Sequence, residues 1–291
     1  MYYEHALTNR LGNRDNNQDR CAVVEHGKAV LLLLADGMGG HARGELAAQV
    51  FINSLTRQFE AQRLPIRSPR GFLRAAITQA HHQIVESGLK QNPPVRPRTT
   101  GIACLVQSGH ACWAHVGDSR LYLIRNRRVL FRTRDHSHVS ELIEQGMITE
   151  EEAGRHPLRN FVSRSLGGES EAPEPTIEQE SMLKAGDILI LCSDGLWSAL
   201  PEKRLSELAS QPDLANLTEQ LASEAEYQSY PHSDNISIVT FRWLSTAKQK
   251  NGGGQGTYDQ IVDDEPGAET STSGGNRLNQ VFRNLASLRR R

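Results

Sequence analysis

One apolar run, VLLLLA at positions 30–35, constrains the fold more than any other feature of the chain. A strand that is apolar at every position must be buried on both faces, so it lies inside a layered structure. The run ends in Asp36, which is followed by glycines at positions 37, 39 and 40. A carboxylate at the end of a buried strand is costly unless a cation or a hydrogen-bond donor meets it. The glycines let the backbone bend tightly and approach such a partner closely.

Length and charge narrow the class of protein. The chain has 291 residues, enough for one large domain, and a formal net charge of −1. This charge predicts no nucleic-acid partner and no general attraction to an anionic membrane. The polar N-terminus lacks the core of a signal peptide, and no apolar stretch approaches the roughly 20 residues of a membrane span. Four cysteines without CxxC spacing indicate buried thiols in a reducing compartment, and we therefore expect a cytoplasmic protein.

The order of apolar patterns predicts strands in blocks that are separated by helix pairs. A stripe at every fourth residue from Ala47 to Phe59 predicts one helix, and Ser68-Pro69 begins a second that ends at Gly88. A short helical region is expected over 139–154, with a capping box at Thr149. Strands are expected in the segments CAVVE, AVLLLLAD, TTGIACLVQ, HACWAHVGD, RLYLIRN, RVLFRT, DILILCSDG and NISIVTFRW. This arrangement favours antiparallel sheets with segregated helices over a parallel doubly wound sheet.

The composition changes near Ala247. Residues 247–276 are rich in Gly, Ser and Thr with an acidic patch, which predicts a flexible linker. Residues 277–291 combine apolar residues at helical spacing with arginines and no acid, which predicts a basic amphipathic tail. The simplest interpretation is a frayed end, and docking to a partner or a membrane surface is the alternative.

Aspartates recur where the predicted strands begin or end. They are Asp19, Asp36, Asp118, Asp194 and Asp234. Each could be an ordinary turn residue. If they converge instead, their mutual repulsion demands cations. Oxygen ligands favour Mg²⁺ or Mn²⁺ over zinc, and a carboxylate shared by two ions about 3.5–4 Å apart would activate water for attack on phosphate. Arg14 could then hold the phosphate through its planar fork.

Six motifs, RDNNQD, DGMGGH, RTTG, GDSR, SDGLW and DN, occur in an order and spacing that resemble the metal-dependent serine/threonine phosphatases of the PP2C (PPM) family. The resemblance covers residues 5–244, and DGMGGH together with the segment that follows Glu144 resembles the bacterial branch. It implies an α+β fold: a four-layer α-β-β-α sandwich of two antiparallel sheets flanked by helix pairs. The phosphatase domain would span 1–246, with a flap at 139–168.

Carried over by motif, the resemblance implies a role for each matching residue. Asp36 would bridge two Mn²⁺ or Mg²⁺ ions, and Gly37 would offer its carbonyl to one of them. Asp194 and Asp234 would ligate the other ion. Asp118 would share a third ion with Asp194, although an ordinary turn is an equal alternative for it. Asp19 would hold metal-bound water from further out, where Gln18 and Asn235 also lie, and Arg14 would clamp the phosphate.

The reaction that the family implies is direct attack of a metal-bridging hydroxide on phosphoserine or phosphothreonine of a phosphoprotein, reversing a bacterial serine/threonine kinase. Three residues depart from the pattern. Met38 replaces a histidine proposed as general acid, Gln18 replaces a glutamate, and Ser198 replaces a carboxylate of the third ion. A thioether cannot donate a proton, so the leaving group must be protonated by water or by another residue. A phosphoprotein-binding module with weak catalysis remains the alternative function, and recruitment through the tail is a further one.

Overall fold

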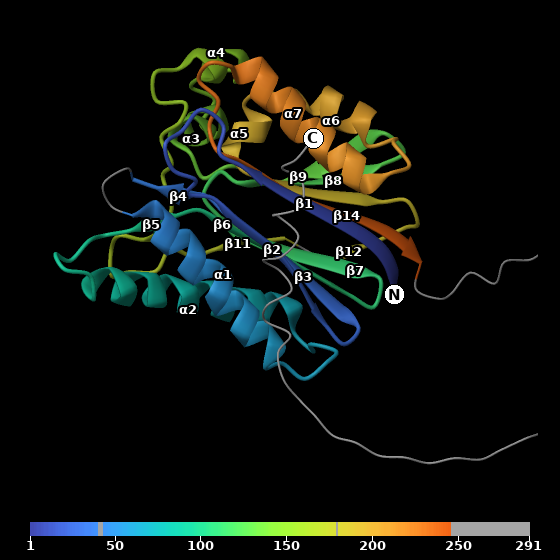
Figure 1. Cartoon of the computed structure of the whole chain (residues 1–291), viewed down its shortest axis with the longest axis horizontal. Helices are drawn as coiled ribbons and strands as arrows, with labels where there is room; N and C mark the ends of the chain where they lie inside the picture. Colours follow the sequence, from blue (N-terminus) through green and yellow to red (C-terminus); the bar gives the residue numbers. More distant parts are fainter. Residues whose placement is uncertain (40–42, 179, 246–291) are drawn as a thin grey trace, which may run out of the picture. The chain divides into compact units, whose positions relative to one another are not determined.

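The computed structural model describes residues 1–39, 43–178 and 180–245. Within this part of the chain, two β-sheets stack face to face and helices cover both outer faces (Figure 1). The helix-sheet-sheet-helix order confirms the predicted α+β sandwich. Residue 40 of the glycine loop, the predicted linker (247–276) and the predicted tail (277–291) lie outside the described residues.

The first sheet is antiparallel and has the strand order β1-β14-β13-β8-β9. Its strands, in that order, span Tyr2–Arg10, Ile236–Ser245, Ile188–Cys192, Arg120–Arg125 and Arg128–Arg132. The first and last strands of the domain therefore pair with each other, and Arg10 lies opposite Ile236.

The second sheet is also antiparallel and has the order β11-β7-β6-β3-β2. Its strands span Thr176–Ile177, His110–Val116, Gly101–Gln107, Ala29–Ala35 and Arg20–His26, and β12 (Ser181–Met182) also pairs with β7. A small third sheet joins β10 (Leu166–Gly167), β5 (Arg98–Thr99) and β4 (Gly37–Met38). In this sheet, β5 pairs on one side with β4, which directly follows Asp36, and on the other with β10, which lies at the end of the predicted flap.

Helices form the two outer layers. The second sheet is covered by α1 (Gly44–Glu60) and α2 (Pro69–Leu89), and the first by α5 (Asp194–Trp197), α6 (Glu202–Leu208) and α7 (Leu214–Ser229). The predicted flap holds two short helices, α3 (His138–Glu144) and α4 (Glu150–Arg155). In the described ranges, no helix combines the length and apolar character that a membrane crossing requires.

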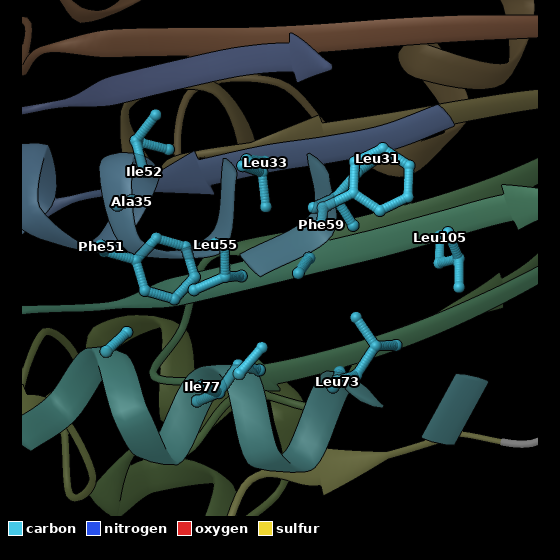
Figure 2. Close-up of a cluster of buried hydrophobic side chains, with 14 of the residues drawn as sticks. Leu31, Leu33, Ala35, Phe51, Ile52, Leu55, Phe59, Leu73, Ile77 and Leu105 are labelled. Carbon is cyan, nitrogen blue, oxygen red and sulfur yellow. The ribbon is translucent and has the colours of Figure 1, made fainter. Parts of the chain in front are cut away.

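The four layers enclose three separate hydrophobic clusters. Successive side chains of β3 point to opposite faces of the sheet and so belong to two different clusters. Leu31, Leu33 and Ala35 face α1 and α2 (Figure 2), whereas Leu32 and Leu34 face the other sheet. Strand β13 divides in the same way, with Ile190 toward the helices and Leu189 toward the partner sheet. The prediction that VLLLLA is buried on both faces is therefore confirmed.

Most predicted elements are present, with differences at their ends. Ser68 caps α2 by accepting a hydrogen bond from the Gly71 amide, but the helix runs to Leu89 rather than ending at Gly88. The single helical region expected over 139–154 is two helices, and the capping box of Thr149 begins the second one. Strand β1 was not predicted, because its short apolar pattern gains burial only by pairing with β14.

The layered core predicts that truncating two leucines will change the free energy of unfolding by very different amounts. Leu33 is fully buried and Leu89 is 65% exposed. We expect Leu33→Ala to lower the free energy of unfolding by about 2–5 kcal/mol, because it removes buried methyl groups and leaves a cavity. The control Leu89→Ala should change it by less than about 0.5 kcal/mol. Urea unfolding measures both, and equal effects would contradict the layer assignment.

Candidate functional site

The register of both sheets brings the five predicted aspartates to one end of the sandwich. Asp19 precedes β2 and Asp36 follows β3, and these strands pair with Arg20 opposite Ala35. Asp118 follows β7, whose last residue lies opposite the first residue of β6. In the other sheet, Cys192 lies opposite both Arg120 and Ile238, so that Asp194 and Asp234 flank the same edge.

Asp36 lies at the electrostatic centre of this group. Burial raises the pKa of Asp36 well above its usual range, and the charges of the other four aspartates raise it further. Burial likewise raises the pKa of Asp194, with Asp118, Asp234 and Asp19 adding to the shift. Like charges at close range disfavour ionisation of all of them. Together with the strand register, these mutual effects place the five aspartates near one another at this end of the sandwich, and their roles as ligands or as turn residues stay predictions.

Asp19 and Asp118 are the most buried members, with 1% and 5% of their surface exposed. Burial raises the pKa of Asp19 to about 6, against the opposing effect of the Ser193 and Ser237 side chains. Among the described residues, the Oδ2 atom of Asp19 is buried without a hydrogen-bond partner. Burial also raises the pKa of Asp118 to about 6, and the charge of Asp135 contributes to this rise.

Arg14 lies at the edge of the group, where its Nη2 atom is 2.6 Å from Oδ2 of Asp234. Their side chains are 57% and 36% exposed, so this ion pair is screened by solvent. In the part of the chain that the structure describes, no three His, Cys, Asp or Glu side chains already form a group that could hold a metal ion. The predicted ligand set thus stays a prediction.

Asn235 fastens the loop that carries Arg14 and Asp19. Its side-chain amide donates to the carbonyls of Leu11 and Asn16 at 2.8 and 3.1 Å, and its Oδ1 atom accepts the Gln18 amide at 2.9 Å. The Gln18 side chain donates to Glu45 at 3.1 Å. Both predicted outer residues therefore hold loops in place.

Two threonines of the RTTG motif fix the backbone of Asp36. The hydroxyl of Thr100 accepts the Asp36 amide at 3.0 Å, and the Thr99 hydroxyl donates to the Asp36 carbonyl at 2.8 Å. Beyond Asp36, the backbones of Gly37 and Gly44 touch. A Cβ atom on Gly44 would lie 2.5 Å from the carbonyl carbon of Gly37, so only glycine fits there. Sequence reasoning missed the role of Gly44.

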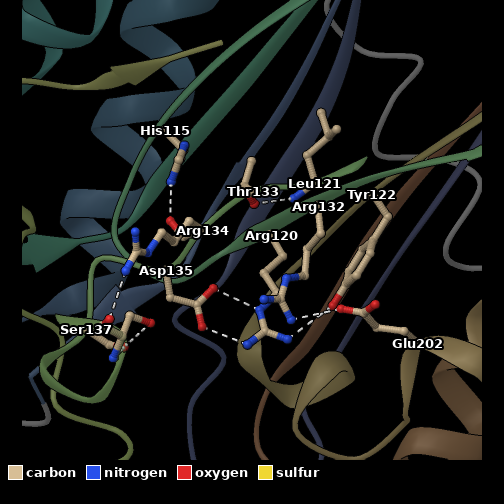
Figure 3. Close-up of polar contacts among 11 residues, drawn as sticks. His115, Arg120, Leu121, Tyr122, Arg132, Thr133, Arg134, Asp135, Ser137 and Glu202 are labelled. Carbon is tan, nitrogen blue, oxygen red and sulfur yellow. Dashed lines mark hydrogen bonds and ion pairs between the residues drawn. The ribbon is translucent and has the colours of Figure 1, made fainter. Parts of the chain in front are cut away.

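Sequence reasoning also missed a buried cluster beside Asp118. Arg120 donates from Nε and Nη2 to the two carboxylate oxygens of Asp135 at 2.8 and 2.7 Å (Figure 3). Its guanidinium carbon lies 3.8 Å from the ring centroid of Trp197. His136, next to Asp135, accepts the amide of Gly117 on Nδ1 at 3.1 Å. The GDSR and SDGLW motifs contain Arg120 and Trp197, but only the fold brings them together.

The donor set fits a hard divalent cation. All five carboxylates supply oxygen, they repel one another, and the Asp19 oxygen is left without a partner within the described ranges. Mg²⁺ and Mn²⁺ favour such ligands.

Comparison with known proteins gives a consistent result. The family model of protein phosphatase 2C matches residues 8–235. The chain is 33% identical over 229 residues to a putative protein phosphatase 2C-type of Streptococcus pyogenes, covering 78% of this chain and 91% of that protein. The structure of the S. agalactiae serine/threonine phosphatase superposes with a TM-score of 0.76 at 30% identity, covering 84% of this chain and all of that one.

A further solved structure is the catalytic domain of the serine/threonine protein phosphatase PstP in complex with two manganese ions. It has a TM-score of 0.71 at 31% identity and covers 84% of this chain and 99% of that one. The α+β sandwich, with aspartates at one end, is thus of the same class as these phosphatase domains. This chain belongs to the protein phosphatase 2C family.

The carboxylate repulsion predicts a gain of stability when one charge is removed. In EDTA at pH 8, we expect Asp36→Asn to raise the Tm by several degrees, because the raised pKa of Asp36 makes its ionised form costly in the fold. The gain should vanish as the pH falls and Asp36 itself becomes protonated. Thermal unfolding followed by circular dichroism measures this. Asp213→Asn, at the N-cap of α7, is the control and should change little. A lower Tm for Asp36→Asn would contradict the repulsion.

The contact between Gly37 and Gly44 predicts that a single methyl group disturbs the site. We expect Gly44→Ala to destabilise the protein by about 1–3 kcal/mol, because the Gly37 backbone must shift. Gly154→Ala is the matched control, since its Cβ would meet nothing within 4 Å. Urea unfolding and Mn²⁺ titration by calorimetry compare the two. Unchanged stability and Mn²⁺ affinity in Gly44→Ala would refute a tight contact.

Proposed function

We propose that this chain is a protein phosphatase that hydrolyses phosphoserine and phosphothreonine and depends on Mn²⁺ or Mg²⁺. The observation that carries the proposal is the convergence of five carboxylates at one end of the sandwich, with Arg14 beside them. Asp36, Asp194, Asp234 and the carbonyl of Gly37 would hold two ions, and Asp118 would hold a third. When bound, such ions neutralise phosphate charge and lower the pKa of a bound water.

Arg14 would bind the phosphate. Its planar guanidinium matches two phosphate oxygens, and its present partner, Asp234, is a half-exposed carboxylate that binds weakly. A substrate phosphate could therefore take the guanidinium once Asp234 engages a cation. Asn235 keeps Arg14 within reach, because it ties the loop of residues 11–18 to the start of β14.

Asp19 would accept hydrogen bonds from ordered water through its free Oδ2 atom. Thr99 and Thr100 would keep Asp36 in place during the reaction, because they hold both its carbonyl and its amide. Met38 has no proton to donate, so the departing serine or threonine oxygen would take its proton from water or from another residue.

Further parts of the proposal concern the setting. The natural substrates would be phosphoproteins modified by a bacterial serine/threonine kinase, in the cytoplasm. All four cysteines are free thiols, and three of them are buried, in keeping with a reducing compartment. Two alternatives stay open for the predicted tail (277–291), namely a frayed end and a segment that docks to a partner or a membrane surface.

Hydrolysis of an aryl phosphate and of a phosphothreonine peptide, in EDTA, Mg²⁺ or Mn²⁺, tests the proposal. We expect activity only with metal, and at least about a hundredfold lower kcat for Asp36→Asn and Asp194→Asn, because each loses a ligand charge. Asp213→Asn should keep wild-type activity. If the wild type bound the phosphopeptide but turned over neither substrate at any metal concentration, the binding-module alternative would replace the phosphatase.

A further inference from the structure

A cavity of about 370 Å³ lies between the flap helices and the ends of two strands of the first sheet. Val139, Ile143 and Ala153, from α3 and α4, give it an apolar wall. The facing wall contains Arg120 and Trp197, which stack on each other. The volume of the cavity lies within the range of sites that bind small ligands.

The cavity adjoins the candidate catalytic residues through two of its walls. Arg120 lies two residues after Asp118, and the charges of Arg120 and Asp135 both act on Asp118. Ser198, also on the lining, donates its amide to the carbonyl of Asp194 at 2.9 Å. An extended peptide advances about 3.3–3.6 Å per residue. A substrate whose phosphorylated residue lies at the carboxylates would therefore present a nearby side chain here.

The charges on the lining indicate which side chain fits. Arg120 is neutralised by its two bonds to Asp135 (Figure 3). Arg132 bonds Glu202 through Nη1 at 2.8 Å, and no bond from its Nε or Nη2 atom is found among the described residues. Arg159, an exposed residue on the lining, forms no ion pair with any residue in that part of the chain. Two guanidinium groups with unused donors favour a carboxylate.

Two acids lie on the lining, and the one that is not paired with an arginine opposes this preference. Glu150, the first residue of α4, likewise has no ion-pair partner within the described ranges. It lowers the attraction for a negative side chain, and because Arg132 is paired with Glu202, the preference rests on the unused donor groups of Arg132 and Arg159 rather than on an excess of charge. Glu150 also supplies a test of opposite sign.

We propose that this cavity, which we call the flap pocket, binds an acidic side chain that neighbours the phosphorylated residue of the substrate. Its carboxylate would meet Arg159 and Arg132, and its methylene groups would pack on Val139, Ile143 and Ala153. The inference rests on the proposed phosphatase activity and adds a preference among phosphoproteins. Arg159 is then a specificity-determining residue.

A series of phosphothreonine peptides tests this proposal, each with a single Glu at one position from four before to four after the phosphothreonine. The matched peptides carry Gln at the same position. We expect one position at which Glu raises kcat/KM about fivefold over Gln, through a lower KM, because the contact forms equally in the ground state and the transition state.

Arg159→Gln should reduce this preference to within about twofold, and Arg159→Lys should retain part of it. Glu150→Gln should increase it. Arg155→Gln is the control, because Arg155 lies on the same flap but pairs with Glu151 and is not on the lining. All four variants should hydrolyse the aryl phosphate as the wild type does, which keeps the outcome separate from that of the proposed activity.

Two results would overturn the inference while the aryl phosphate is still hydrolysed. One is the absence of a Glu preference at every position in the wild type. The other is an equal loss of preference in Arg159→Gln and Arg155→Gln, which would indicate a general field of positive charge rather than a pocket.

Discussion

Burial of both faces of each sheet is the constraint on which the rest of the structure depends. With three hydrophobic clusters stacked between four layers, no polar side chain can leave the middle of β3 or β13 without entering a core. Chemistry is therefore confined to the strand ends. The antiparallel register then decides which ends meet, and it places carboxylates from four other segments of the chain near Asp36.

This arrangement concentrates negative charge that the fold itself does not neutralise. Nearby positive groups are placed around the carboxylates rather than among them. Arg14 reaches Asp234 from the solvent side, and Arg120 is occupied by Asp135. The negative charge of the carboxylates is therefore not balanced by side chains of the protein, which favours the binding of divalent cations. Asn235, Thr99 and Thr100 hold the backbone of the site in place through neutral hydrogen bonds. Rigidity and charge are supplied by different residues.

The sequence predicted the elements whose pattern is local and strong. The stripe of α1, the cap of Ser68 and the double-faced β3 are all present, because each follows from neighbouring residues. Strand β1 escaped prediction, since its partner lies more than two hundred residues away. The same reason hid part of the site. Five aspartates at strand ends are visible in the sequence, but the approach of Gly44 to Gly37 and of Arg120 to Trp197 depends on tertiary packing.

The contacts between residues 11–18 and the start of β14 determine when the site can form during synthesis of the chain. The backbone amide of Asn13 donates to the carbonyl of Ser233, and the side chain of Asn235 donates to the same loop. Arg14 forms an ion pair with Asp234. A ribosome releases the first of these residues long before the last, so a nascent chain carries half a site until β14 emerges. The loop of residues 11–18 and the start of β14 can therefore come together only after residue 235 has been synthesised.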